Sequence, residues 1–202
     1  MFSPAIPSTL FQFQGLSHLQ RMGVCHRDMS LENILVDEYT TSIIIDLGMC
    51  LRVPYDSGSG EVGDVSQGGL RRLIQPMIPC GKPNYISPEV MLSEEPFDGF
   101  AIDLWAAGVI LFIMLVGLPP WEFARPEDPR YKMVTRGKLA HMLNSWQRPI
   151  SPLAADLLQR MLTEDPRQRL SLTEVKDHPW VCAEENCDDM DAGAGGNEGW
   201  RG

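Results

Sequence analysis

The stretch CHRDMSLENILVD, residues 25–37, is followed a few positions later by IIIDLGMC, residues 43–50. The β-rich runs at 34–36 and 42–45 flank the turn-like segment DEYTT, so the two segments together predict a small hairpin. Asp28 and Asn33 precede that hairpin, and Asp46 ends its second run. Taken alone, the tripeptide His26-Arg27-Asp28 is a weak signal, Asn33 fits a plain loop and Asp46 fits a strand-end turn.

Three further motifs follow in order: CGKPNYISPE at 80–89, DLWAAGV at 103–109 and DPRQRL at 165–170. The ordered set resembles the C-terminal lobe of a eukaryotic protein kinase over roughly residues 8–181. The resemblance implies a mainly α fold of the α+β kinase type, with a small β-hairpin. It divides the chain into an incomplete kinase domain at 1–181 and an acidic, glycine-rich tail at 182–202 that we expect to be disordered.

The resemblance also implies the site residues. Phosphoryl transfer depends on positioning and charge neutralisation. Asp28 would accept or orient the proton of the substrate hydroxyl. Asn33 and Asp46, which are hard oxygen donors, would hold the Mg²⁺ of bound ATP, and Leu35 would lie on the nucleotide side.

Other residues would be structural in such a domain. His26 would pack in the core, together with Leu47 in place of the more usual phenylalanine, and Arg27 would pair with a phosphate on the activation loop. Glu89 would form a buried ion pair with Arg169. Asp103, at the start of a buried helix, would cap the backbone of the His26–Arg27 turn.

Two positions depart from the family pattern together. Serine/threonine kinases carry a lysine two residues after the catalytic aspartate, where this chain has Ser30. They carry a threonine after the glycine of the later loop, where this chain has Lys82. Because these positions touch in the folded family, Lys82 is predicted to supply the charge that Ser30 lacks; two unrelated losses are the alternative.

Kinases of this family carry about a hundred residues ahead of the His-Arg-Asp turn, forming a β lobe with a glycine-rich loop. Here 25 residues precede His26. We therefore expect the N-terminal β lobe to be absent and the chain alone to bind Mg·ATP poorly. The glycines at 57–65 make a poor nucleotide loop, because no strand lysine follows them.

Between Ser66 and Tyr85 there is no Ser, Thr or Tyr, so Arg27 has no obvious phosphate partner. Ser57, Ser59 and Ser66 lie in the Gly- and Ser-rich insert and are candidate modification sites. Activity without phosphorylation of this loop is equally open.

Helices are predicted at 8–22, 100–116, 131–146, 152–162 and 171–177. Ser151 is placed as an N-cap, and Ser171 with Glu174 forms a capping-box pattern. The apolar run Leu104 to Val116 is thirteen residues and by itself too short to cross a bilayer.

Composition bounds the partners. The net charge of −10 argues against nucleic-acid binding, which needs a basic face. Five cysteines without a CxxC pair favour free thiols in a reducing compartment. No secretory signal or membrane span is visible, so we expect a cytoplasmic protein, with a nuclear location also open.

The favoured function is an ATP-dependent serine/threonine protein kinase that acts on protein substrates. Leu31-Glu32-Asn33 is nearer to the serine/threonine pattern than to the tyrosine-kinase one. A catalytically inactive binding or scaffold module is the alternative. A metal-dependent hydrolase using Asp28 and Asp46 is disfavoured, because it gives no role to Glu89, Asp103 and Arg169.

Overall fold

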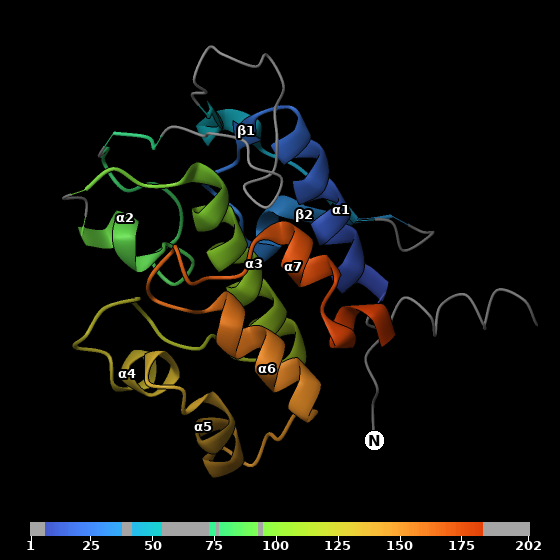
Figure 1. The fold of residues 1–202 in the computed structure, drawn as a ribbon, viewed down its shortest axis with the longest axis vertical. Coiled ribbons are helices and arrows are strands. Elements are labelled where there is room, and N and C mark those ends of the chain that lie inside the picture. Colours follow the sequence, from blue (N-terminus) through green and yellow to red (C-terminus); the bar gives the residue numbers. More distant parts are fainter. Residues whose placement is uncertain (1–6, 38–41, 54–72, 76, 93–94, 184–202) are drawn as a thin grey trace, which may run out of the picture.

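A computed structural model describes residues 7–37, 42–53, 73–75, 77–92 and 95–183 (Figure 1). Residues 184–202 of the tail predicted to be disordered, the glycines at 57–65 and the candidate sites Ser57, Ser59 and Ser66 lie outside the described residues. The first two residues of that predicted tail, Cys182 and Ala183, are helical.

Helices dominate the described part of the chain. They include α1 (Pro7–Arg21), α2 (Pro88–Leu92), α3 (Gly99–Val116), α4 (Pro129–Thr135), α5 (Leu139–Ser145), α6 (Pro152–Met161) and α7 (Leu172–Lys176). The strands are β1 (Val24–Cys25), β2 (Ile34–Val36), β3 (Ser42–Ile44) and β4 (Leu51–Arg52), and two short 3-10 turns are η1 (Leu31–Asn33) and η2 (Leu47–Met49). The mainly helical architecture predicted from the sequence is confirmed for these residues.

The long helix α3 forms the centre of the fold, with α1 and α6 packed against it (Figure 1). It begins after Asp98, whose side chain accepts the Phe100 N–H at 2.9 Å, and it ends before Gly117. At 18 residues it is longer than the predicted apolar run, and its length and hydropathy would suffice for a membrane span. Because 83% of its residues are buried, packing in the core accounts for its apolar sequence.

An aromatic cluster joins α3 to the loop and helix that follow it. The Trp105 and Trp121 rings stack with their centroids 5.2 Å apart, and Tyr131 of α4 meets Trp121 edge-on at 5.4 Å. All three side chains are buried. Stacked and edge-to-face pairs of this kind add to the stabilisation from buried apolar area.

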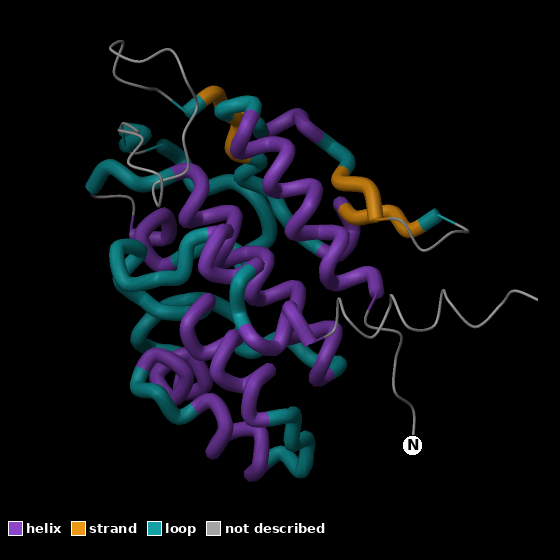
Figure 2. The backbone as a smooth tube through the Cα atoms, turned by 45° about the vertical axis from the view of Figure 1, so that its right-hand side comes forward, coloured by secondary structure: helices purple, strands orange, loops and turns teal. Residues whose placement is uncertain are grey.

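The predicted hairpin is confirmed. Strands β2 and β3 pair antiparallel, with Leu35 opposite Ile43. A second two-stranded sheet, β1 with β4, was not predicted, because strands of two residues carry no periodicity (Figure 2). Cys25, Cys50 and Cys80 are free thiols, as predicted.

The single helix predicted at 131–146 is wrong, because the structure divides it into α4 and α5 at Gly137. Gly137 has φ 73°, a left-handed conformation that glycine adopts at little cost. Its N–H donates to the Val134 carbonyl at 3.0 Å, and the Lys138 N–H donates to the Met133 carbonyl at 2.9 Å. These bonds close the end of α4. The predicted caps are confirmed: the Ser151 hydroxyl accepts the Ala154 N–H, and Ser171 and Glu174 form a complete capping box.

Candidate active site

Asp103 fixes the loop that carries Asp28. Its carboxylate accepts the His26 N–H at 2.6 Å and the Arg27 N–H at 2.8 Å, as predicted. It lies in the second turn of α3 rather than at the helix start, where Asp98 is the cap. Burial raises the pKa of Asp103 to about 7, against the opposing effect of the two N–H donors.

His26 links this loop to the strand that leads to Asp46. Its ring is fully buried, as predicted. The Asp28 N–H donates to Nδ1 at 3.3 Å, so Nδ1 is the acceptor and Nε2 carries the proton that is donated to the Ile45 carbonyl at 3.0 Å. The imidazole therefore holds the Asp28 loop and the residue before Asp46 at a fixed separation.

Asn33 and Asp28 are in direct contact. The Asn33 amide nitrogen donates to the Asp28 carbonyl at 2.7 Å and lies 3.3 Å from the Asp28 carboxylate oxygen Oδ2. Because these contacts use the nitrogen of the amide, its oxygen is left to coordinate a cation. The short turn η1 brings Asn33 back towards Asp28.

Asp46 lies next to this pair through the backbone, because the Ile45 N–H donates to the Asn33 carbonyl at 2.9 Å. Asp46 itself has φ 62° and ψ 67°, and its carboxylate accepts the Gly48 N–H at 3.3 Å. A left-handed conformation is uncommon for a residue with a side chain, and such residues gather at functional sites. Leu47 was expected in the core with His26, but that prediction is wrong, since the side chain is 57% exposed.

Arg27 also has a left-handed backbone, with φ 68°. Its Nη1 donates to the Met49 carbonyl at 3.3 Å, on the turn after Asp46. The phosphate contact predicted for Arg27 stays a prediction, because its candidate partners lie outside the described residues.

The predicted ion pair between Glu89 and Arg169 is present and bidentate. Nη1 and Nη2 of Arg169 lie 2.7 and 3.0 Å from the two carboxylate oxygens of Glu89. The Arg169 side chain is fully buried and also donates to the carbonyls of Ala101, Thr163 and Glu164. Charge-assisted, forked contacts of this type fix the helix α2 to the helical base.

The 80–87 segment meets the Asp28 loop closely at Gly81. A Cβ on Gly81 would lie 2.9 Å from the Asp28 carboxylate, and its φ of 92° favours glycine. The next residue, Lys82, extends its ammonium to within 3.4 Å of the Ser30 hydroxyl. The structure therefore brings together the two positions whose changes in sequence appeared to be coupled.

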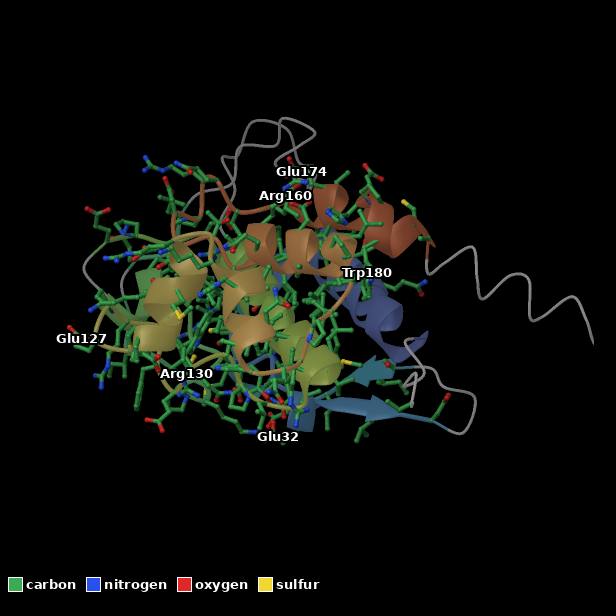
Figure 3. All side chains as sticks on the ribbon, turned by 90° about the horizontal axis from the view of Figure 1, so that it is seen from below. Glu32, Glu127, Arg130, Arg160, Glu174 and Trp180 are labelled. Atoms are coloured by element: carbon green, nitrogen blue, oxygen red, sulfur yellow. The ribbon has the colours of Figure 1, made fainter. Side chains whose placement is uncertain are left out.

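Lys82 has a second partner that sequence reasoning missed. Its Nζ lies 2.7 Å from Glu32 Oε2, and this contact holds the pKa of Glu32 below its usual value. Glu32 lies at the edge of the molecule (Figure 3). Glu32 belongs to the Leu31-Glu32-Asn33 pattern, but that pattern gives no indication of a contact with Lys82.

Asp28, Gly81 and Lys82 border a shallow cleft, open to solvent, between the Asp28 loop, the 80–90 segment and α3, whereas Asn33 and Asp46 do not line it. Asp28 and Lys82 contribute to its polar lining, and Val90, Ile102 and Ala106 contribute to its apolar lining. Leu35, predicted on the nucleotide side, is 52% exposed on β2 and does not line this cleft. Within the described residues no group of three or more His, Cys, Asp or Glu side chains is arranged around a common metal position.

A family model described as the protein kinase domain matches residues 9–181 of this chain. The chain is 36% identical to serine/threonine-protein kinase SAPK9 of Oryza sativa subsp. japonica over 186 residues, which is 91% of this chain and 46% of that protein. It is 33% identical to fatty acyl-CoA synthetase and RNA processing-associated kinase 1 of Saccharomyces cerevisiae over 171 residues, 83% of this chain and 18% of that protein.

The calcium/calmodulin-dependent protein kinase type II alpha chain of Drosophila melanogaster is 32% identical over 176 residues, 85% of this chain and 29% of that protein. The matched segments span less than half the length of each of these three relatives.

Proposed function

This chain belongs to the eukaryotic protein kinase family, and we propose that it transfers the γ-phosphoryl group of Mg·ATP to serine or threonine hydroxyls of proteins. The observation that carries the proposal is the Asp28–Asn33 contact at 2.7 and 3.3 Å, with Asp46 joined to it through the Ile45–Asn33 hydrogen bond. These three residues are a proton acceptor and two oxygen donors at one place.

Asp28 would orient the substrate hydroxyl and receive its proton as the oxygen attacks phosphorus. The Asn33 contact holds that carboxylate in place, and the Asp103 bonds hold the loop behind it. Positioning of this kind is the main contribution a protein makes to phosphoryl transfer.

The donor set of Asn33 and Asp46 fits Mg²⁺, which takes hard oxygen ligands and keeps room for water and phosphate oxygens. The amide oxygen of Asn33 and the carboxylate of Asp46 would hold the ion. When bound, Mg²⁺ would neutralise charge on the phosphates during transfer.

Lys82 would bring positive charge to the transferring phosphoryl group in place of a lysine at position 30. Its contact with Ser30 supports this role, because Ser30 follows Asp28 by two residues in the same loop. We expect Lys82→Ala to lower the transfer rate and the exchanged variant Ser30→Lys/Lys82→Thr to restore it. An exchanged variant no more active than Lys82→Ala would refute this role.

A nucleotide bound at Asp46 would be shielded from water only if a second protein surface covered it. Several apolar side chains near Asp46 are about half exposed, including Leu35, Ile43 and Met49. We propose that they face a β lobe that covers the nucleotide, with Leu35 on the nucleotide side. An exposed apolar face of this kind marks an interaction surface. Without that lobe, weak binding of Mg·ATP is expected.

The test is phosphate transfer from γ-labelled ATP to a mixture of proteins, using protein isolated from its native cells with the segments and partners it carries there. We expect labelling of serine and threonine that requires Mg²⁺ and falls about 10²-fold or more in Asp46→Asn. The matched control is Asp177→Asn, at an exposed aspartate after α7. Stable folding and partner binding without any Mg²⁺-dependent transfer would instead support a binding or scaffold module.

A further inference from the structure

We infer that Glu32 is a positioning residue that holds the Lys82 ammonium beside Ser30 at the phosphoryl-transfer site. The inference rests on the proposed function for its catalytic meaning. Its geometric part, that Glu32 determines where the ammonium lies, is independent of any activity.

The contact distances rank the two partners of Lys82. The Glu32 carboxylate lies 2.7 Å from Nζ, within the range of a charge-assisted hydrogen bond. The Ser30 hydroxyl lies 3.4 Å away and is neutral, so its contact is longer and weaker. Removing Glu32 therefore removes the stronger of the two partners.

Ser30 offers its hydroxyl to both charged side chains, Lys82 and Glu32. It is fully buried and stands at the N-cap position of η1, yet its side chain makes no capping hydrogen bond. The hydroxyl accepts from the Lys82 ammonium at 3.4 Å and also hydrogen-bonds the Glu32 carboxylate, so the three side chains form one group.

The turn η1 supports both halves of the site. Its second residue, Glu32, contacts Lys82, and its third residue, Asn33, contacts Asp28. One short turn thereby sets the ammonium and the carboxylate relative to each other. This arrangement explains why a charged contact at the protein surface has a consequence for the reaction site.

The backbone of Lys82 is held by contacts that do not involve its side chain. The Lys82 carbonyl accepts the Tyr85 N–H at 2.9 Å and the Ile86 N–H at 3.3 Å, and Gly81 packs against Asp28. A lysine side chain keeps several free torsions beyond that point. Its charged end lies where its partners hold it, so the loss of Glu32 releases the ammonium without unfolding the segment.

A contribution to folding stability does not explain the ion pair between Lys82 and Glu32. The side chains of Lys82 and Glu32 are 43% and 61% exposed, and ion pairs this exposed contribute little to folding. We therefore expect Glu32→Gln to fold normally, which makes it a clean variant for testing position.

The first test is NMR of the full chain labelled with ¹⁵N,¹³C-lysine, at one fixed pH and ionic strength. The chain has four lysines, Lys82, Lys132, Lys138 and Lys176, so assignment is simple. We expect Lys82 to show the slowest ammonium hydrogen exchange of the four and to lose this protection in Glu32→Gln. The matched control is Glu127→Gln, whose carboxylate faces Arg125. Equal Lys82 exchange in wild type and Glu32→Gln would overturn the inference.

The second test is a double-mutant cycle on phosphate transfer, with Glu32→Gln, Lys82→Ala and both together. We expect Glu32→Gln to lower kcat by about tenfold to 10²-fold, as displacement of a site group does, and to have no further effect once Lys82 is alanine. A rate that is unchanged or raised by Glu32→Gln alone would overturn the inference.

The two tests separate the two claims. If the wild-type protein transfers no phosphate, the proposed function fails, while the lysine spectra still decide whether Glu32 holds Lys82. If transfer occurs and depends on Lys82 but not on Glu32, the proposed function stands and the positioning role fails.

Discussion

Replacing Glu89 by glutamine breaks one side of the ion pair that joins α2 to the helical base. The substitution keeps the side-chain shape and leaves the Arg169 guanidinium buried. One of the two forked contacts, at 2.7 and 3.0 Å, then lacks an acceptor oxygen. The carboxylate charge that balances Arg169 is lost with it.

Removing one partner of a buried ion pair costs about 3–5 kcal/mol, because the other charge stays buried without compensation. Arg169 is fully buried, but Glu89 is 14% exposed. Arg169 also keeps three backbone acceptors, the carbonyls of Ala101, Thr163 and Glu164. Both facts place the loss at the lower end of the range, and we expect Glu89→Gln to lower the free energy of unfolding by about 3 kcal/mol.

The assay is urea unfolding followed by tryptophan fluorescence. Trp105 is a local probe, since its ring lies 4.8 Å from the Arg169 guanidinium carbon. The matched control is Glu127→Gln, which breaks a 3.9 Å contact between exposed side chains and should change stability by less than about 1 kcal/mol. A Glu89→Gln variant as stable as this control would show that the pair does not hold α2 to the base.

Further changes test the loop geometry, a titration and a helix cap. Gly81→Ala should destabilise the fold by about 1–2 kcal/mol, because alanine is strained in the left-handed backbone conformation. It should also lower the rate of phosphate transfer, because the new methyl group meets Asp28. Gly137→Ala, which has open space around the new methyl group, should show only the loss of stability from backbone strain. Burial raises the folded-state pKa of Asp103 from 3.8 to about 7. The protein should therefore lose on the order of 4 kcal/mol of stability as pH rises from about 4 through 7. Urea titrations at a series of pH values should show that Asp103→Asn flattens this dependence. Ser171→Ala should cost about 1 kcal/mol by thermal or urea unfolding, since it removes the capping box of α7.

Each of these has a contrary outcome. Equal transfer rates for the two glycine variants would mean that Asp28 tolerates the methyl group. If the stabilities of the wild type and of Asp103→Asn change with pH in the same way between pH 4 and 7, the buried carboxyl does not hold its proton in the folded state. An unchanged unfolding midpoint in Ser171→Ala would show that the cap does not stabilise α7.

The long-range contacts were predictable because the motifs occur in a fixed order. Asp103 under the His26–Arg27 turn and Arg169 beside Glu89 span about 80 residues or slightly fewer in sequence, and no local pattern connects them. The pairing of Lys82 with Ser30 followed from two coupled changes at positions that touch in the family. The hairpin followed from β-branched residues on both sides of a turn.

Other features were missed although their signals were present. Gly137 lies between two charged residues inside the predicted helix 131–146, and an interior glycine lowers the expectation of a continuous helix. Asp98 precedes a long apolar run, which is the pattern of an N-cap. The prediction that placed Asp103 at the start of this helix overlooked that cap.

Glu32 could not be assigned from sequence, because its role depends on where the Lys82 side chain ends in space. Surface glutamates are common, and their partners are set by tertiary contacts. The exposure of Leu47 was likewise unpredictable, because an apolar residue after Asp46 looks the same in sequence whether it lies in the core or at the surface.

The most direct measurement is phosphate transfer from γ-labelled ATP to serine and threonine, comparing wild-type protein from its native cells with Asp28→Asn. General acid–base groups contribute about 10²–10⁴-fold to rate. If Asp28 is the proton acceptor held by Asn33, we expect Mg²⁺-dependent labelling by the wild type and a loss of that size in the variant, with unchanged unfolding behaviour. Equal labelling by the two proteins, or no labelling by the wild type, would contradict the assignment of this site to phosphoryl transfer.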